Sequence, residues 1–184
     1  MVSQFVSSHK VNLLGDLDFD FPEGTHAIGR LDNNSEGLLL LTTNKKVTRL
    51  LFSGDEKHKR VYLVQVNNIL STENLQRLQS GVMIRIKGNE NYTTPACEVT
   101  LAEHPEMLYN FEKEILKNYG PHTWLLITLT EGKYHQVRKM IAAVRHRCKR
   151  LIRVSIEDIK LEGLAPGAVR EVSEVDFFNK LRIG

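Results

Sequence analysis

The sequence has little cysteine and no motif with metal-ligand spacing. Cys97 and Cys148 are its two cysteines, and neither belongs to a CxxC pair or to a Cys/His cluster with metal-ligand spacing. Both are therefore expected to be small packed residues, and no metal is expected. HExxH, P-loop and GxGxxG motifs are also absent, so no nucleotide or other cofactor is expected.

Long apolar runs are missing as well. No segment has the roughly 20 consecutive apolar residues that a membrane-spanning helix needs. The first residues lack the basic start, apolar core and small-residue cleavage site of a signal peptide. A membrane protein is excluded on this ground, and a cytoplasmic location is expected. With no repeats or linkers in its 184 residues, the chain is expected to form a single domain, residues 1–184.

The net charge is only +3, but the basic residues are unevenly distributed. Between residues 131 and 153 there are eight lysines and arginines and one glutamate, and between residues 45 and 60 there are six against two acids. Two such patches could flank one groove that binds a polyanion. The alternative is that these side chains only solvate helix faces.

Hydrophobic patterning predicts an α+β fold, because helical and strand-like segments are mixed along the chain. Strands are expected at 38–42, 60–66, 82–86, 96–101, 124–130, 151–156 and 169–172. Helices are expected after Asn44, after Ser71 or Thr72, from Pro105 to a point before Gly120, over residues 137–144, and from Ser173.

The most specific feature is the segment 29–42, GRLDNNSEGLLLLT, which places an acid in a polar loop before an apolar run. Such a loop can present Asp32 from a rigid scaffold, while the leucines anchor it. Taken alone, an aspartate before Asn-Asn-Ser is more often a turn former or helix cap than a catalyst. A hydrolase that uses Ser35 is a weaker alternative, since residues 34–37 do not form a GxSxG elbow.

This segment resembles the GRLDxxSxGLLLLT signature of the RsuA family of ribosomal-RNA pseudouridine synthases. Further matching stretches are RVY at 60–62, EGKYHQVRKM at 131–140, LIR at 151–153 and LAPGAVRE at 164–171. The likeness extends over nearly the whole chain from residue 27 and is strongest to the short members that modify large-subunit ribosomal RNA. It implies a mixed, mainly antiparallel central sheet flanked by helices, with a basic active-site cleft across the sheet.

The resemblance also implies an enzyme that isomerises uridine to pseudouridine in structured ribosomal RNA. Asp32 would be the nucleophilic carboxylate, Tyr62 would stack on the displaced base, and Arg138 would pair with Asp32 and keep it ionised. Leu151 would form an apolar wall behind the base. Because the base must leave its stack to react, the RNA has to be held firmly. Contacts to RNA are expected from Arg30, Lys133, Gln136, Lys139 and Arg153.

The sequence departs from the family pattern in three places. Members commonly carry an N-terminal S4-type RNA-binding domain, and too few residues precede position 27 to form one. The usual N-terminal strand with Asn-Lys-Pro is absent, so an edge strand is expected to be missing. Arg145 replaces a glycine before His146.

The main competing hypothesis is a non-catalytic RNA-binding module of the same fold. Binding a polyanion gives no reason to place a carboxylate in the groove. The joint presence of Asp32, Tyr62 and Arg138 therefore favours an enzyme, which is expected to act as a monomer.

Overall fold

A computed structural model of the chain describes residues 1–53, 56–109 and 120–184. The helices are α1 (Lys46–Ser53), α2 (Thr72–Ser80), α3 (Gln136–Ala143) and α4 (Glu174–Leu181), with short 3-10 turns η1 (Leu14–Asp16), η2 (Lys87–Asn89) and η3 (Pro105–Met107). The strands are β1 (His26–Ile28), β2 (Glu36–Gly37), β3 (Leu40–Thr42), β4 (Arg60–Asn67), β5 (Met83–Arg85), β6 (Asn91–Thr93), β7 (Glu98–Leu101), β8 (His122–Leu129), β9 (Cys148–Ile156) and β10 (Ile159–Lys160). This mixture confirms the expected α+β class.

The central sheet has the strand order β10-β9-β4-β8-β7, and β2 joins it by pairing with β9. The β2–β9 pair is parallel, whereas the pairs along the rest of the sheet are antiparallel. The sheet is therefore mixed and mainly antiparallel, as predicted. Small sheets of β1 with β3 and of β5 with β6 complete the described strands.

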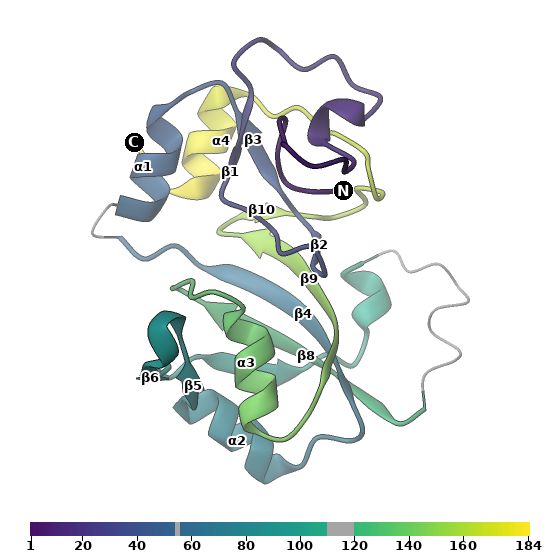
Figure 1. Cartoon of the computed structure of the whole chain (residues 1–184), viewed down its shortest axis with the longest axis vertical. Helices are drawn as coiled ribbons and strands as arrows, with labels where there is room; N and C mark the ends of the chain where they lie inside the picture. The colour runs from purple at the N-terminus through teal and green to yellow at the C-terminus, as the bar shows by residue number, and fades with distance from the viewer. Residues whose placement is uncertain (54–55, 110–119) are drawn as a thin grey trace.

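Each face of the central sheet has its own hydrophobic core, because alternate residues of a strand point to opposite faces. Leu63 of β4 packs into one core with Val47 of α1 and Leu181 of α4, which we call the α1/α4 core. Val64 of β4 packs into the other with Met140 of α3, and Leu78 of α2 belongs to the same α2/α3 core. In Figure 1, α1 and α4 lie at one end of the molecule and α2 and α3 at the other, with β4, β8 and β9 between them.

Most predicted elements occur close to their expected limits. The Oγ atoms of Ser71 and Ser173 cap α2 and α4 by accepting hydrogen bonds from Asn74 N and Asp176 N, each at 3.2 Å. The strand predicted at 169–172 is wrong, because this extended segment pairs with no described strand. The helix predicted from Pro105 begins as the η3 turn, and its continuation over 110–119 lies outside the described residues.

Arg145 follows the end of α3 in a left-handed conformation, with a φ of 61°. Its N donates to Ala142 O at 2.9 Å, which helps to close the helix end. Glycine adopts this conformation at no steric cost, whereas another residue pays roughly 1–2 kcal/mol. Arg145 therefore adopts the conformation that glycine favours at a helix end, at the cost of some backbone strain.

No helix in the described part of the chain is long and apolar enough to cross a membrane.

Candidate active site

Asp32 lies in the loop between β1 and β2, and the loop is fixed at several points. Ser35 N donates to Asp32 O at 2.8 Å, which closes a turn directly after the acid. Leu38 N donates to Arg153 O of β9 at 2.8 Å. On the other side, Leu31 N donates to Ser3 Oγ at 3.0 Å. The sheet and the N-terminal segment together hold the backbone that presents the carboxylate, as a functional side chain requires.

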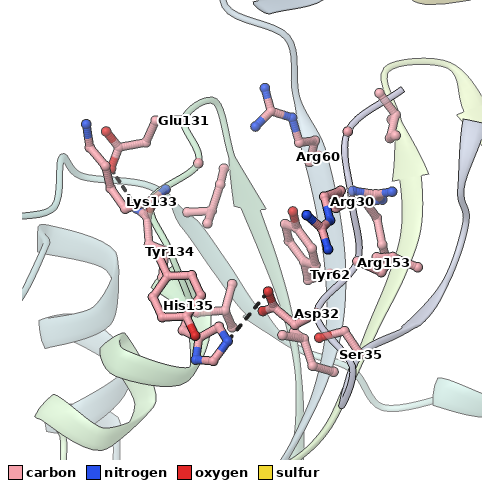
Figure 2. A pocket seen from close by; sticks show the side chains of 18 of the residues that line it. Arg30, Asp32, Ser35, Arg60, Tyr62, Glu131, Lys133, Tyr134, His135 and Arg153 are labelled. Carbon is pink, nitrogen blue, oxygen red and sulfur yellow. Dashed lines mark hydrogen bonds and ion pairs between the residues drawn. The ribbon is translucent and has the colours of Figure 1, made fainter. Parts of the chain in front are cut away.

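Asp32 lines a pocket of about 260 Å³ between its own loop, β4, β9 and the segment that precedes α3. Its side chain is 34% exposed. Figure 2 shows the carboxylate between two groups of side chains, Arg30, Arg60, Tyr62 and Arg153 on one side and Lys133, Tyr134 and His135 on the other. Four of the lining residues are lysine or arginine and two are acids, Asp32 and Glu131, so the pocket is the basic cleft that the sequence predicted.

The side chain that faces the Asp32 carboxylate is that of His135. Its Nε2 lies 3.6 Å from Asp32 Oδ1, as the dashed line in Figure 2 shows. His135 immediately precedes α3 and has a left-handed φ of 55°. The ring of Tyr134 stacks on the imidazole, with the ring centres 3.9 Å apart and the planes inclined by 19°. The unusual backbone and the stacking together point the imidazole at the carboxylate.

The expected ion pair between Arg138 and Asp32 does not form in this structure. Nη1 of Arg138 donates to Cys148 O of β9 at 3.4 Å, and Nη2 donates to Asn34 O. Both peptide oxygens lie within reach of the guanidinium, which therefore links α3 to β9 and to the Asp32 loop. Arg138 therefore holds the loop that carries Asp32 and does not contact the Asp32 carboxylate directly.

Tyr62 and Arg153 form one side of the pocket and lie opposite each other on β4 and β9. Tyr62 is half-buried, whereas Arg153 is only 6% exposed. Nε of Arg153 donates to Leu38 O at 2.8 Å. Burial lowers the pKa of the Arg153 guanidinium, while Tyr62 partly offsets this effect. Leu151 is buried and also lines the pocket, at the position expected for an apolar wall.

Hydrogen bonds within the protein fix the segment 131–136, which forms the opposite side. Glu131 accepts hydrogen bonds from the Tyr92 hydroxyl and from Gln136 Nε2, the latter at 2.6 Å. Lys133 N donates to Gln136 Oε1 at 2.8 Å. The hydrogen bond to Glu131 raises the pKa of Tyr92. Both ends of the Gln136 amide are thus engaged within the protein, where the sequence led us to expect a contact to RNA.

The predicted site residues are only partly brought together. Asp32, Tyr62, Arg30, Lys133, Gln136, Leu151 and Arg153 all line the pocket. Arg138 and Lys139 are not among the lining residues, and Lys139 Nζ lies 5.3 Å from the centre of the Tyr134 ring.

The sequence predicted no role for His58 or His135 and counted Arg60 only within the basic patch 45–60, but all three residues line the pocket as well. Alternation along the strand could have indicated Arg60, which lies two residues before Tyr62. No local signal indicated that His135 would lie beside Asp32.

This arrangement places a carboxylate, which can act as a nucleophile or base, in a basic pocket beside an aromatic ring. A pocket of this kind suits a polyanionic substrate with a planar group. The described residues contain no group of three or more histidines, cysteines or acids that could hold a metal ion. The fold and the site therefore define an enzyme of nucleic-acid chemistry.

Comparison with known proteins identifies its family. The family model described as RNA pseudouridylate synthase matches residues 10–143. The chain is 37% identical over 149 residues to the ribosomal large subunit pseudouridine synthase E of Xanthomonas axonopodis pv. citri, and this alignment covers 81% of the chain and 76% of that protein. It is 31% identical over 177 residues to the ribosomal small subunit pseudouridine synthase A of Vibrio parahaemolyticus, and this alignment covers 94% of the chain and 68% of that protein.

A solved structure described as a pseudouridylate synthase superimposes with a TM-score of 0.68 at 26% identity, over 89% of this chain and 63% of that one. The chain belongs to the RNA pseudouridylate synthase family. This membership confirms the family, the fold and the enzyme class that the sequence predicted.

Proposed function

We propose that this protein converts a uridine of large-subunit ribosomal RNA into pseudouridine, with Asp32 as the nucleophilic carboxylate. The observation that carries the proposal is the position of Asp32 in a basic pocket beside Tyr62. The family membership supplies the reaction type. Relatives named for the large subunit are 32–37% identical to the chain, and relatives named for the small subunit are 31% and 33% identical. The three highest of these values belong to large-subunit enzymes, which favours the large subunit as the source of the substrate.

The reaction breaks the bond between C1′ of the ribose and N1 of uracil and forms a bond between C1′ and C5. The uracil turns within the pocket, N1 gains a proton, and the hydrogen on C5 is released to water. A carboxylate suits this sequence, because it can attack or stabilise an electron-poor sugar carbon and then leave again. The reaction contains no net redox change, so the proposal includes no cofactor.

The other site residues receive roles that agree with their positions. Tyr62 stacks on the displaced base, and Leu151 forms the apolar wall behind it. His135 faces the Asp32 carboxylate and orients it. Arg138 is a positioning residue, because it holds Asn34 O in the same loop as the acid.

Contacts to the RNA come from the basic side chains around the pocket. Arg30 and Lys133 contact phosphates, which fix the position of the RNA without reading its sequence. Lys139 extends this contact surface beyond the pocket. Because the base must be displaced to reach Asp32, the substrate is a structured RNA from which the uridine swings out. We further propose that the protein acts as a monomer in the cytoplasm.

Release of tritium from ribosomal RNA labelled at uracil C5 tests the reaction. The wild-type protein is expected to release label from large-subunit RNA and not from small-subunit RNA. Asp32→Asn is expected to abolish release while leaving RNA affinity within about twofold, since phosphate contacts dominate binding. Asp20→Asn is the matched control, because Asp20 is exposed and lies outside the pocket.

Two results would contradict the proposal. Equal release by Asp32→Asn and the wild type would remove the catalytic role of Asp32. RNA binding by the wild type without release from either RNA would favour the non-catalytic module instead.

A further inference from the structure

Three buried polar side-chain atoms without a hydrogen-bond partner lie around the same pocket. They are Ser35 Oγ, His58 Nε2 and Arg153 Nη2. Buried polar groups in folded proteins are nearly always paired, and an unpaired one costs about 1–3 kcal/mol. Their concentration around one pocket indicates that a bound molecule supplies the missing partners.

Arg153 is the most exceptional of the three, because it is a buried cation without a counter-ion. It is 6% exposed, and no described carboxylate lies within 4.0 Å of its nitrogens. The two acids of the pocket are engaged elsewhere, Asp32 by His135 and Glu131 by Tyr92 and Gln136. Burial lowers the pKa of Arg153, Tyr62 partly offsets this effect, and the nearby charge of Arg60 adds to the lowering. An anion bound at Nη2 would relieve both effects.

His58, which also lines the pocket, carries a second unpaired nitrogen, Nε2. The residue is 3% exposed, and its Nδ1 lies 3.6 Å from Glu157 Oε1. Glu157 is held in turn by Lys59 N, which donates to Oε1 at 2.5 Å. With Nδ1 directed at Glu157, the Nε2 atom on the other side of the ring is left for a ligand.

The backbone brings His58, Arg60 and Arg153 to one side of the pocket. Residues 58, 60 and 62 alternate along an extended segment, and all three line the pocket. Arg153 lies directly opposite Tyr62 on the neighbouring strand. Figure 2 shows Arg60 and Arg153 on the Tyr62 side of Asp32, away from His135.

We propose that His58, Arg60 and Arg153 form a subsite for one phosphodiester group of the RNA, next to the displaced uridine. The guanidinium groups of Arg60 and Arg153 have no counter-ion among the described residues. A phosphate would neutralise them with a full negative charge, which a uracil carbonyl cannot supply. Arg153 is held in place by Leu38 O, so that its free Nη2 is already oriented. This inference rests on the proposed function only in taking RNA as the ligand.

Binding of short oligouridylate and of oligocytidylate of the same length, measured over a range of salt concentrations, tests the subsite. Arg153→Gln is expected to weaken binding of both about tenfold, as for the loss of a charge-assisted hydrogen bond. The slope of log affinity against log salt should fall by about 0.7, which is the value of one phosphate contact in single-stranded nucleic acid. Arg77→Gln is the charge-matched control, because Arg77 is exposed on α2 and lies outside the pocket.

Arg60→Gln decides the question if the Arg153 variant does not fold, because Arg60 is only partly buried. It should lower the salt slope in the same way. A loss confined to oligouridylate would show that these residues read the base, and an unchanged slope or an equal loss in Arg77→Gln would also overturn the proposal. The experiment does not depend on catalysis, so a protein that bound RNA through this subsite but released no tritium would contradict the proposed reaction alone.

Discussion

Gly37 lies where β2 runs beside β9, and its position leaves no room for a side chain. A Cβ at this residue would lie 2.3 Å from Arg153 O and 2.8 Å from Arg153 N. The φ of 99° is strained for any other residue. Close contact between these two backbones therefore requires glycine, and the same contact fixes both the Asp32 loop and Arg153.

Gly37→Ala is expected to lower the free energy of unfolding by about 3 kcal/mol, from backbone strain and overpacking together. It should also reduce tritium release, because β2 must move away from β9. Urea unfolding measures the stability. Gly15→Ala is the control, since its Cβ would lie 3.9 Å from the nearest atom, Phe5 Cδ1, at an ordinary contact distance. Equal losses in the two variants would contradict this account.

Cys148 at the start of β9 makes the stability of the protein depend on pH. Burial raises the pKa of its thiol from 9.0 to about 11, although Arg138 partly opposes this effect. A raised pKa means that the native state keeps the proton longer than the unfolded chain does. The associated stability is therefore complete below pH 9 and is lost as the pH rises towards 11.

Cys148→Ala should remove this part of the pH dependence. Between pH 9 and pH 11 the free energy of unfolding of the wild type is expected to fall by about 2 kcal/mol more than that of the variant. Chemical unfolding at a series of pH values measures both. Parallel curves for the two proteins would show that the thiol does not contribute.

Among the elements of the fold, the β5–β6 hairpin reaches the site through Tyr92. Its hydroxyl and Gln136 Nε2 both donate to the Glu131 carboxylate, so the position needs an acceptor for two donors. In Glu131→Gln an NH₂ group replaces one carboxylate oxygen. It would face the donor of either Tyr92 or Gln136, and that hydrogen bond would be lost. The segment that carries His135 should then lose its fixed position.

We therefore expect Glu131→Gln to lower stability by about 1–2 kcal/mol and the rate of tritium release about tenfold, with RNA affinity little changed. Glu98→Gln on β7 is the matched control, because Glu98 is exposed and accepts a single hydrogen bond at 3.5 Å, from Thr128. Thermal unfolding and single-turnover release distinguish the two variants. A Glu131 variant that behaved like Glu98→Gln would show that the hairpin does not position the site.

Helices and strands that are long enough to show a periodic pattern of apolar residues could be predicted from the sequence. The strand around Tyr62 and the helix through Met140 are examples. The short strands β1 and β2 were missed because they exist through pairing with β3 and β9 and have no local signal. The segment 169–172 has strand-forming valines, but no described strand lies beside it. Pairing between distant segments decided these cases.

The site residues likewise separate into those that a local motif indicates and those that depend on contacts between distant segments. Asp32 and Tyr62 were predicted from a motif, and the structure places both in one pocket. Arg138 was predicted to pair with Asp32, but its guanidinium binds the peptide oxygens of Asn34 and Cys148. The left-handed backbone of His135, just before α3, places the His135 side chain beside Asp32 instead. Which of two basic side chains lies next to the carboxylate depends on distances in the folded structure, and these cannot be read from the sequence.

At the scale of the whole molecule, the two cores share one sheet. β4, β8 and β9 supply residues to both the α1/α4 core and the α2/α3 core. Loss of packing on one face should therefore loosen the strands that support the other face. We expect the described fold to unfold as a single cooperative unit.

The single tryptophan provides a probe of this coupling, because Trp124 packs in the α1/α4 core. Met140 is fully buried in the opposite core, and Met140→Ala is expected to cost about 3 kcal/mol. The urea midpoints from Trp124 fluorescence and from far-UV circular dichroism should fall together. Met83→Ala, at a residue that is 62% exposed, should leave the free energy of unfolding from both probes within about 0.5 kcal/mol of the wild type. A Met140 variant with an unchanged fluorescence midpoint would mean that the two faces unfold separately, and the pocket would then lie between independent units instead of on one rigid sheet.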